Sequence, residues 1–303
     1  MSRRREARLL PAVALLIAGS LLAAAPAARD KAFWRAVVAA DYALPEGESA
    51  AALIHELSEL LGSTDPEERD GFGYGIPVRW IYVQRMLSPQ ELRQLLTLWS
   101  ANLRAGIGES GTNSVLLRSF SALDLSILAA LDNEETFLEE ADFRRLLVTA
   151  LRYLADEQDV RGFVPGTGWL HSVAHTADLL KFLARNKRLQ QADQARILAA
   201  VAAKMQAPGA TVYQHGEDER LARAVLALFH RPDLDQEAVK QWLEGLAARS
   251  QGMWEGPLDP VRFAEVQNAK NLLKSLYVIL SAEEAGKSPA SLRPQILAAI
   301  GAL

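Results

Sequence analysis

The stretch SPQELRQLLTLW, Ser88 to Trp99, decides the fold class. Its first four residues form a capping box with proline at the first helical position, which is a signal for the start of an α-helix. Behind that start, apolar side chains recur at helical spacing, at Leu92, Leu95, Leu96 and Trp99. This segment therefore carries both the start signal and the apolar face of an amphipathic helix.

The same helical period continues along almost the whole chain after Asp30. No run of four to eight alternating β-branched residues competes with it, and the connectors between the periodic segments are short. The sequence therefore predicts an all-α protein. The predicted helices span residues 31–43, 49–61, 66–87, 89–105, 113–131, 137–155, 168–186, 192–205, 218–230, 236–249, 260–282 and 289–302.

The arrangement of these helices is predicted from the number of residues in each helix pair. A pair of helices takes about 40–45 residues, which is the period of HEAT- and armadillo-like solenoids. We expect an open, curved α/α superhelix of about six degenerate helix pairs. A closed α/α toroid is the alternative, because twelve helices also make six pairs. Such a ring leaves little room for connecting loops in a chain of 303 residues.

Residues 1–27 have the layout of a secretory signal peptide. Four arginines precede the apolar run 9–25, and the small residues Ala25-Pro26-Ala27 fit a cleavage site. A membrane anchor is the alternative, although a proline, a glycine and many alanines make the run only mildly hydrophobic. We expect cleavage near Ala27, an exported protein that is periplasmic or secreted, and a single mature domain, residues 28–303, without a membrane span.

The charge of the mature chain limits its partners. Removal of residues 1–27 takes away four arginines and one glutamate, so the formal net charge changes from −4 to −7. An acidic chain without a concentrated basic stripe argues against a nucleic-acid partner. The chain contains no cysteine, so no disulfide stabilises it and the burial of apolar side chains must do so.

Two of the five histidines lie four residues apart in the stretch GWLHSVAHTADLL, at His171 and His175, and Asp178 follows them. The glycine- and proline-containing loop Arg161–Thr167 comes before, and its threonine is the predicted N-cap of the next helix. On a helical wheel the three polar side chains fall within about 60° of one face, away from the apolar stripe. We therefore expect them to face a groove, a loop or solvent.

Three interpretations of this cluster stay open. The first is structural, with capping and interhelix hydrogen bonds that fix the preceding loop. The second is a divalent metal site, because His171, His175 and Asp178 can present three ligands, although the HEXXH form is absent. The third is a metal-free pocket in which Asp159, Asp178 or Glu157 handles protons beside a histidine. The helix dipole favours a neutral His171 and opposes a cation, so the third is preferred to the metal.

Four motifs resemble the bacterial family catalogued as domain of unknown function 2785. They are LLRSFSALDLSIL, YLADEQDVRGFVPGTGWLHSVAHTADLL, GEDERLARAV and NAKNLLKSLYVIL, and the likeness covers roughly residues 65–285. The resemblance implies an all-helical protein without an assigned activity. It therefore supports the fold and the choice of residues, and it adds no reaction.

The same motifs add candidate residues outside the histidine cluster. Arg118 lies in the middle of one predicted helix, and Glu217 and Arg220 open another. If the helices stack in order, these side chains line one concave surface with the histidines. The alternative is that Arg118 and Arg220 pair with Asp159 or Glu157 and fix the packing of helices. The predicted ligand-binding residues are Glu157, Arg161, Trp169, Arg118, Glu217 and Arg220.

The sequence thus predicts an exported α-helical scaffold with a polar groove around His171, His175 and Asp178, which binds a small molecule or a peptide. The alternative is a hydrolase-like enzyme, metal-dependent or acid/base, that uses the same cluster together with Asp159. A Trp169→Ala substitution is expected to destabilise the fold by about 3–5 kcal/mol if the ring is part of the core, and barely if it is a pocket wall.

Overall fold

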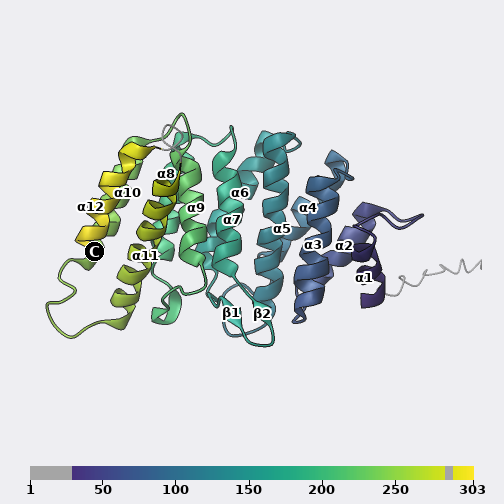
Figure 1. The fold of residues 1–303 in the computed structure, drawn as a ribbon, viewed down its shortest axis with the longest axis horizontal. Coiled ribbons are helices and arrows are strands. Elements are labelled where there is room, and N and C mark those ends of the chain that lie inside the picture. Colours follow the sequence, from purple (N-terminus) through teal and green to yellow (C-terminus); the bar gives the residue numbers. More distant parts are fainter. Residues whose placement is uncertain (1–28, 284–288) are drawn as a thin grey trace, which may run out of the picture.

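The structure, a computed structural model, describes residues 29–283 and 289–303. Within these ranges the chain is all-α, with a single two-stranded ribbon as its β-structure (Figure 1). The prediction of an all-α fold is confirmed. The predicted signal peptide, residues 1–27, lies outside the described part of the chain.

Every predicted helix has a helical counterpart among the described residues. The α-helices there are α1 (Lys31–Ala39), α2 (Ala50–Leu60), α3 (Gly75–Pro77), α4 (Pro89–Asn102), α5 (Ser114–Glu134), α6 (Glu140–Asp156), α7 (Ser172–Arg185), α8 (Gln191–Lys204), α9 (Glu217–Phe229), α10 (Gln236–Ala247), α11 (Pro260–Ala282) and α12 (Arg293–Ala302). Short 3-10 segments lie at Pro208–Ala210, Ala248–Ser250 and Ala290–Leu292.

The start of α4 is the capping box that the sequence predicts. The amide of Ser88 donates to Glu91 Oε2 at 2.7 Å, and the amide of Glu91 donates to Ser88 Oγ at 3.4 Å. These two hydrogen bonds satisfy the backbone amides of Ser88 and Glu91, which have no partner within the helix. The four apolar side chains of the predicted stripe are all buried, namely Leu92, Leu95, Leu96 and Trp99.

The predicted helix 66–87 differs from the expectation in its internal geometry. Two π-helical segments, η1 (Glu67–Tyr74) and η2 (Val78–Val83), flank the short α3. A π-helix is rare and is found frequently at functional sites. Gly73 lets η1 approach α2 closely, because a Cβ at this position would lie 3.2 Å from the side chain of Leu61. The wide turns place Tyr74 at the end of η1.

The helices pack in two layers. Helices α5, α7, α9 and α11 pack in succession in one layer, and α6, α8, α10 and α12 do so in the other (Figure 1). Helices α5 and α7 run parallel, because hydrogen bonds join Ser119 to His175 near their starts and Asn133 to Asn186 at their ends. Residues one turn apart on α5 therefore face residues one turn apart on α7.

Helix α5 is at the centre of the core. By length and composition it is the one helix among the described residues that could cross a membrane, and 89% of that apolar window is buried inside the protein. It also carries the buried polar side chains Arg118 and Asp124. The apolar composition of α5 therefore matches its position between η1, α4 and α7.

The start of the predicted helix 168–186 is wrong by four residues. Strands β1 (Phe163–Val164) and β2 (Gly168–Trp169) form an antiparallel hairpin, and α7 begins only at Ser172. The physical reason is the backbone at Gly166 and Gly168, where φ is 83° and 84°. These are left-handed values that glycine adopts readily and that a right-handed helix does not contain.

Candidate functional site

His171 lies before α7 and not within it. It takes the N-cap position, for which Thr167 was predicted, in a left-handed conformation with φ 47° and ψ 34°. The helical wheel therefore does not describe where its ring points. The rings of His171 and His175 nevertheless lie together, with centres 5.7 Å apart and planes at 84°. The tight turn, and not a shared helix face, brings the two imidazoles together.

His175 is held as a neutral imidazole. Its Nδ1 lies 2.8 Å from Ser119 Oγ, and the Ser119 hydroxyl donates its one hydrogen to the carbonyl of Leu170. Nδ1 must therefore be the donor to Ser119, which leaves Nε2 as an acceptor. Burial, followed by the charges of His171 and Arg220, lowers the pKa of His175 well below its usual value. No hydrogen bond within the described residues reaches Nε2.

His171 has the complementary orientation. Its Nε2 lies 3.0 Å from the carbonyl oxygen of His215, so Nε2 is the donor and Nδ1 is an acceptor. Burial lowers the pKa of His171, which keeps this ring neutral as well. The two rings thus present two unprotonated nitrogens without a hydrogen bond from the described part of the protein.

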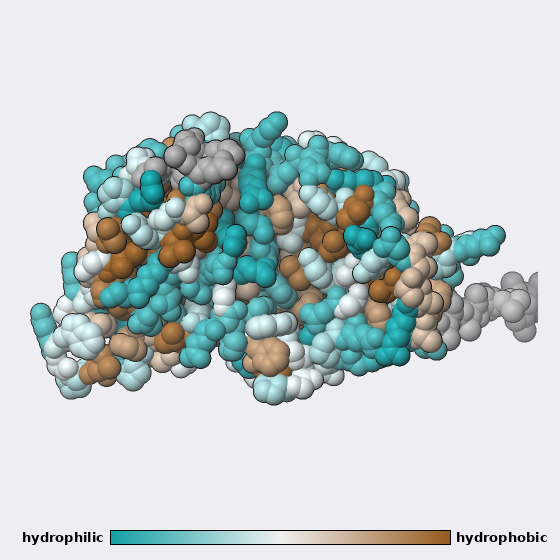
Figure 2. Space-filling model, viewed as in Figure 1, coloured by the Kyte–Doolittle hydropathy of each residue, from teal (hydrophilic) through white to brown (hydrophobic). Residues whose placement is uncertain are grey.

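Aromatic rings form an exposed shelf beside the imidazoles. The ring of Trp169 stacks on His171 with centres 4.3 Å apart and planes at 25°, and Phe163 meets Trp169 edge-on at 4.9 Å. Trp169 and Phe163 are 42% and 44% exposed. We call Phe163, Trp169 and His171 the aromatic shelf. Figure 2 shows a hydrophilic band between apolar patches in the middle of this face, above the hairpin that carries the shelf.

Asp178 is not available beside the histidines. It is 4% exposed, it accepts a hydrogen bond from Lys181 Nζ at 2.9 Å, and it forms an ion pair with Arg220. No group of three or more His, Asp or Glu placed to hold a metal ion occurs within residues 29–283 and 289–303. His171, His175 and Asp178 therefore do not assemble as three ligands, because each is turned toward its own partner.

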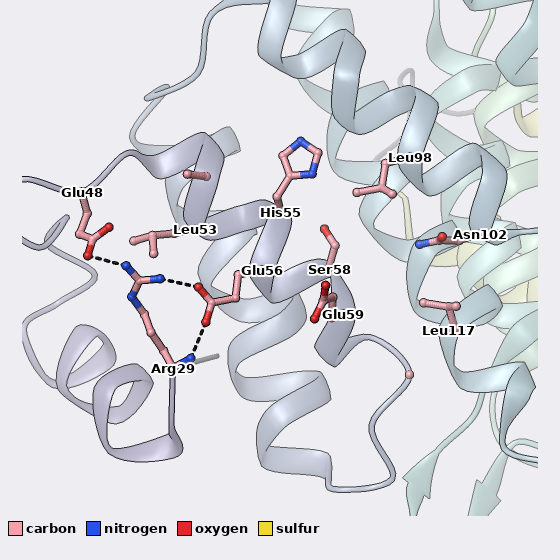
Figure 3. A pocket seen from close by; sticks show the side chains of 12 residues that line it. Arg29, Glu48, Leu53, His55, Glu56, Ser58, Glu59, Leu98, Asn102 and Leu117 are labelled. Atoms are coloured by element: carbon pink, nitrogen blue, oxygen red, sulfur yellow. Dashed lines mark hydrogen bonds and ion pairs between the residues drawn. The ribbon is translucent and has the colours of Figure 1, made fainter. Parts of the chain in front are cut away.

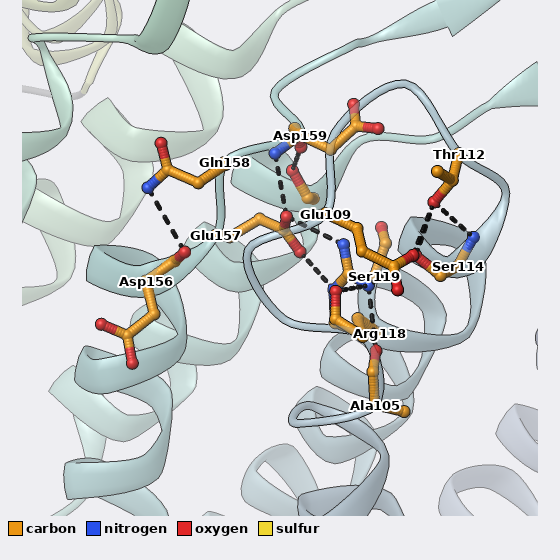
Figure 4. Close-up of polar contacts among 12 residues, drawn as sticks. Ala105, Glu109, Thr112, Ser114, Arg118, Ser119, Asp156, Glu157, Gln158 and Asp159 are labelled. Atoms are coloured by element: carbon orange, nitrogen blue, oxygen red, sulfur yellow. Dashed lines mark hydrogen bonds and ion pairs between the residues drawn. The ribbon is translucent and has the colours of Figure 1, made fainter.

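Arg118 of α5 and Glu157, which follows the last residue of α6, form a buried ion pair (Figure 4). Arg118 Nε and Nη2 donate to the two carboxylate oxygens of Glu157 at 2.7 Å and 3.0 Å. Its Nη1 donates to the carbonyls of Ala105 and Gly106, each at 2.9 Å. These contacts agree with the alternative in which Arg118 pairs with Glu157 and fixes the packing of helices.

Asp159 and Arg161 extend this ion pair into the loop. Arg161 Nε donates to Asp159 Oδ1 at 2.8 Å, and the amide of Gly111 donates to Asp159 Oδ2 at 3.0 Å. We call Arg118, Glu157, Asp159 and Arg161 the junction. Every carboxylate of the junction is hydrogen-bonded within the junction or to the neighbouring loop, so neither Glu157 nor Asp159 is turned toward a histidine to exchange protons with it.

Glu217 contacts the His171 ring indirectly, through the backbone of His215. Its carboxylate is buried and accepts a hydrogen bond from the amide of His215 at 2.8 Å. The carbonyl of His215 in turn accepts from His171. Gly162 permits this close packing, because a Cβ there would lie 2.5 Å from Glu217 Oε1 and 2.5 Å from His215 Nδ1. Glu217 therefore positions the loop that fixes the His171 ring.

Two polar residues outside the predicted set of site residues, Asp124 and Tyr74, lie near the cluster. Asp124 is fully buried in α5, and neither carboxyl oxygen has a hydrogen-bond partner among the described residues. Burial raises its pKa well above the usual value. Burial and the nearby charges of Asp124 and Asp178 raise the pKa of Tyr74 to about 12. A carboxyl between Leu123 and Leu125 in an apolar helix is the one sequence signal of Asp124.

A hollow of ≈ 730 Å³ lies apart from this cluster, among α2, α4 and α5 (Figure 3). Arg29 crosses one side of it and donates to both Glu48 and Glu56 at 2.5 Å. His55 and Leu117 also line it. None of the predicted site residues borders this hollow.

Comparisons with known proteins give one match. A family model described as "Protein of unknown function (DUF2785)" matches residues 103–278, which is more than half of the chain. No curated protein and no solved structure matches. The matched range contains the junction, the aromatic shelf and both imidazoles, and it excludes Tyr74 and most of the hollow around Arg29.

Proposed function

We propose a ligand-binding function for this chain, which belongs to the DUF2785 family of proteins of unknown function. The proposed site is the surface formed by the aromatic shelf and the edge of the adjoining His175 ring. One observation carries the proposal: two neutral imidazoles with unbonded acceptor nitrogens lie beside an exposed Trp169 ring. Ligand-binding sites typically pair an apolar surface with a few fixed polar groups.

The chemistry of these groups defines the ligand in part. His171 Nδ1 and His175 Nε2 accept hydrogen bonds, so the ligand supplies donors such as hydroxyl or amine hydrogens. Trp169 offers a flat apolar surface, so the ligand supplies a face that packs on it. A peptide segment with donor side chains or a small molecule has both features.

We propose that the scaffold is an open α/α superhelix of HEAT- or armadillo-like helix pairs. The successive packing of α5, α7, α9 and α11 supports this arrangement, as does the packing of α6, α8, α10 and α12. The ends α1 and α12 lie far apart in Figure 1, which favours the open form over a closed toroid. We also propose that the protein is exported, on the strength of the basic and apolar pattern of residues 1–27.

A second candidate function is acid/base catalysis at the same site. It is favoured by the neutral His175 ring, whose unbonded Nε2 is an available proton acceptor. Ser119 is no candidate nucleophile, because it is fully buried and its hydroxyl hydrogen is donated to Leu170. Turnover of a bound compound by the wild type, and its loss with unchanged binding in His175→Gln, would select this function over simple binding.

The proposed binding site is tested by ligand-observed NMR against a library of small polar fragments. We expect fragments that bind the wild type to lose their signal with Trp169→Ala and with His175→Gln. Trp254→Ala is the matched control, because Trp254 is 71% exposed and lies outside the cluster. If the Trp169 and Trp254 variants retain binding equally, or if no fragment binds the wild type, the proposed site is wrong.

A further inference from the structure

The hollow of ≈ 730 Å³ among α2, α4 and α5 is a part of the molecule that the proposed function does not use (Figure 3). Its volume is in the range of small-molecule sites, about 300–1,000 Å³. In Figure 3 the ion pairs of Arg29 lie on one side of it, and Leu98 and Leu117 lie on the other. Its lining residues His55 and Glu59 are exposed, so a ligand can enter from solvent.

One side of the hollow already holds a guanidinium group. Arg29 Nη1 donates to Glu56 Oε2 and its Nη2 donates to Glu48 Oε1, each at 2.5 Å. The guanidinium carbon of Arg29 lies 5.0 Å from the centre of the Phe33 ring, and its amide donates to Glu56 Oε1 at 2.6 Å. The hollow therefore binds one organic cation that the chain itself supplies.

The other polar groups of the lining offer hydrogen-bond acceptors. No hydrogen bond or ion pair within residues 29–283 and 289–303 engages the exposed carboxylate of Glu59. Glu48 receives Arg29 through Oε1, so its Oε2 is a second acceptor. Asn102 Nδ2 donates to Ser121 Oγ at 3.0 Å, and the amide oxygen of Asn102 has no partner in the described chain. A ligand that satisfies these groups supplies hydrogen-bond donors.

The charges that line the hollow favour a cation. Its charged side chains are Arg29, Glu48, Glu56 and Glu59, which give a formal net charge of −2 with His55 neutral. Helices α4 and α5 add no charged side chain to this lining. An anion would therefore meet an excess of negative charge, whereas a cation finds the uncompensated carboxylate of Glu59.

Apolar side chains form the rest of the lining. Leu53 is 1% exposed, Leu98 and Leu117 are partly buried against the core, and Ala52 lies beside Leu53 on α2. An apolar part of a ligand that packs against these side chains leaves water, which favours binding. The hollow thus combines an apolar wall with a few fixed polar groups, as ligand sites do.

We propose that this hollow is a second ligand site, which binds a small organic cation, an amine or amidine carried on an apolar body. The positive group lies at Glu59 and Glu48, and the apolar body packs against Leu98 and Leu117. The proposal goes beyond the proposed function, because the hollow shares no residue with the aromatic shelf or with His175. The volume fits a free small molecule, and a basic side chain of a partner protein is the rival source of the same chemistry.

The ligand class is tested by calorimetry with a matched set of probes. Phenylethylamine and benzamidine carry a cation on an apolar ring, phenylethanol is the neutral counterpart, and phenylpropanoate is the anionic one. Both cations are expected to bind the wild type, and to bind more tightly at about 50 mM than at about 500 mM NaCl, because salt screens the attraction between charges. The neutral and anionic probes are expected to bind at least about tenfold more weakly.

Two variants test the place of binding. Glu59→Gln removes the uncompensated charge and is expected to weaken the binding of phenylethylamine by about tenfold. Glu244→Gln is the matched control, because Glu244 is exposed on α10 and does not line the hollow. Ala52→Trp fills the hollow and is expected to abolish the binding of both cations. Ala52 is exposed, so this variant is expected to melt like the wild type.

Several outcomes would overturn the proposal. If phenylethanol binds as tightly as phenylethylamine, or if Glu59→Gln and Glu244→Gln weaken binding equally, the preference for a cation at Glu59 is wrong. If Ala52→Trp retains full affinity, the cations bind outside the hollow. If the peptide Gly-Arg-Gly-Arg-Gly binds and neither free cation does, the ligand is a basic side chain and not a small molecule. If neither cation binds the wild type, no such site exists.

The result is independent of the imidazole site. Trp169→Ala is expected to leave the affinity for phenylethylamine unchanged, because Trp169 does not line the hollow. Loss of amine binding in Trp169→Ala with full retention in Ala52→Trp would assign the amine to the aromatic shelf and overturn the second site alone.

Discussion

The junction and the imidazole site, by which we mean His171, His175 and the nearby Asp124, differ in how their polar groups are bonded. They are neighbours, because the amide of His171 donates to the carbonyl of Arg161 at 3.2 Å. In the junction, Arg118 is fully buried and both oxygens of Glu157 are hydrogen-bonded. In the imidazole site, one nitrogen of His175 and both oxygens of Asp124 have no partner within the described residues. The polar groups of the junction are thus fully hydrogen-bonded in the folded chain, whereas those of the imidazole site are not.

This difference separates residues that the sequence motif presents as one set. A fully hydrogen-bonded ion pair holds helices together, and removal of one of its partners strongly destabilises the fold. Unbonded buried polar groups lower the stability of a folded protein, so each requires an explanation, and for the imidazoles we propose a role in binding. The comparison predicts large stability effects at the junction and small ones at the aromatic shelf.

The largest effect is expected for Arg118→Ala, which leaves the buried Glu157 carboxylate without its cation. The free energy of unfolding, measured by urea denaturation, is expected to fall by about 3–5 kcal/mol. The double variant Arg118→Leu, Glu157→Leu is expected to recover most of that loss, because it buries no lone charge. A loss below about 1 kcal/mol in the single variant would remove the distinction between the two regions.

The next largest effect is expected in the dependence of stability on pH, because His171 and His175 titrate differently in the folded and the unfolded chain. The folded-state pKa values of His171 and His175 are lowered, so the unfolded chain binds more protons below about pH 6.5. The free energy of unfolding is therefore expected to fall as the pH drops below about 6.5, by up to about 1.4 kcal/mol per pH unit for each ring. His175→Phe is expected to make this dependence shallower, and an unchanged slope would contradict the neutral imidazole.

A smaller effect is expected at Gly162, which lies between the two regions. Gly162→Ala places a Cβ against Glu217 and His215, and is expected to destabilise the fold by about 1–3 kcal/mol. Gly245→Ala is the matched control, because nothing lies within 4 Å of its Cβ and it is inside α10. That control is expected to stabilise the fold by about 0.5–1 kcal/mol. Equal shifts in melting temperature for both variants would show that Gly162 is not under packing constraint.

The smallest stability effect is expected for Trp169→Ala. The ring is 42% exposed, so its removal is expected to change the free energy of unfolding by less than about 1 kcal/mol. The same variant is expected to abolish fragment binding. A loss of about 3–5 kcal/mol would instead assign the ring to the core and remove the aromatic shelf from the site.

Local signals in the sequence predicted most of the fold. The capping box at Ser88 and the apolar period after it are formed by residues within one helix, so they can be read without knowing the tertiary structure. The late start of α7 could not be predicted in this way. It depends on left-handed glycines in a hairpin, and two-residue strands have no detectable period.

The site was less predictable than the fold, because its contacts join residues far apart in the chain. The sequence raised the pairing of Arg118 with Glu157 as an alternative, and only the packing of α5 against the end of α6 decides it. Asp124 was not predicted as a site residue, because an acidic residue in an apolar helix does not reveal whether it has a partner in the folded protein. The π-helical turns before Tyr74 were missed because no start signal distinguishes them from α-helical turns.

The π-helical segment η1 makes this part of the protein tolerant of a one-residue change in length. A π-helical turn contains more residues than an α-helical one, so deletion of one residue between Glu67 and Gly73 would let the segment rewind toward an α-helix. The residues after the deletion would then keep nearly their present orientation, because the shortened segment makes nearly the same number of turns. The same deletion inside α4 would rotate every later residue of that helix by about 100° around its axis. Related chains that differ by a single insertion or deletion within η1 are therefore expected to keep Tyr74 in place.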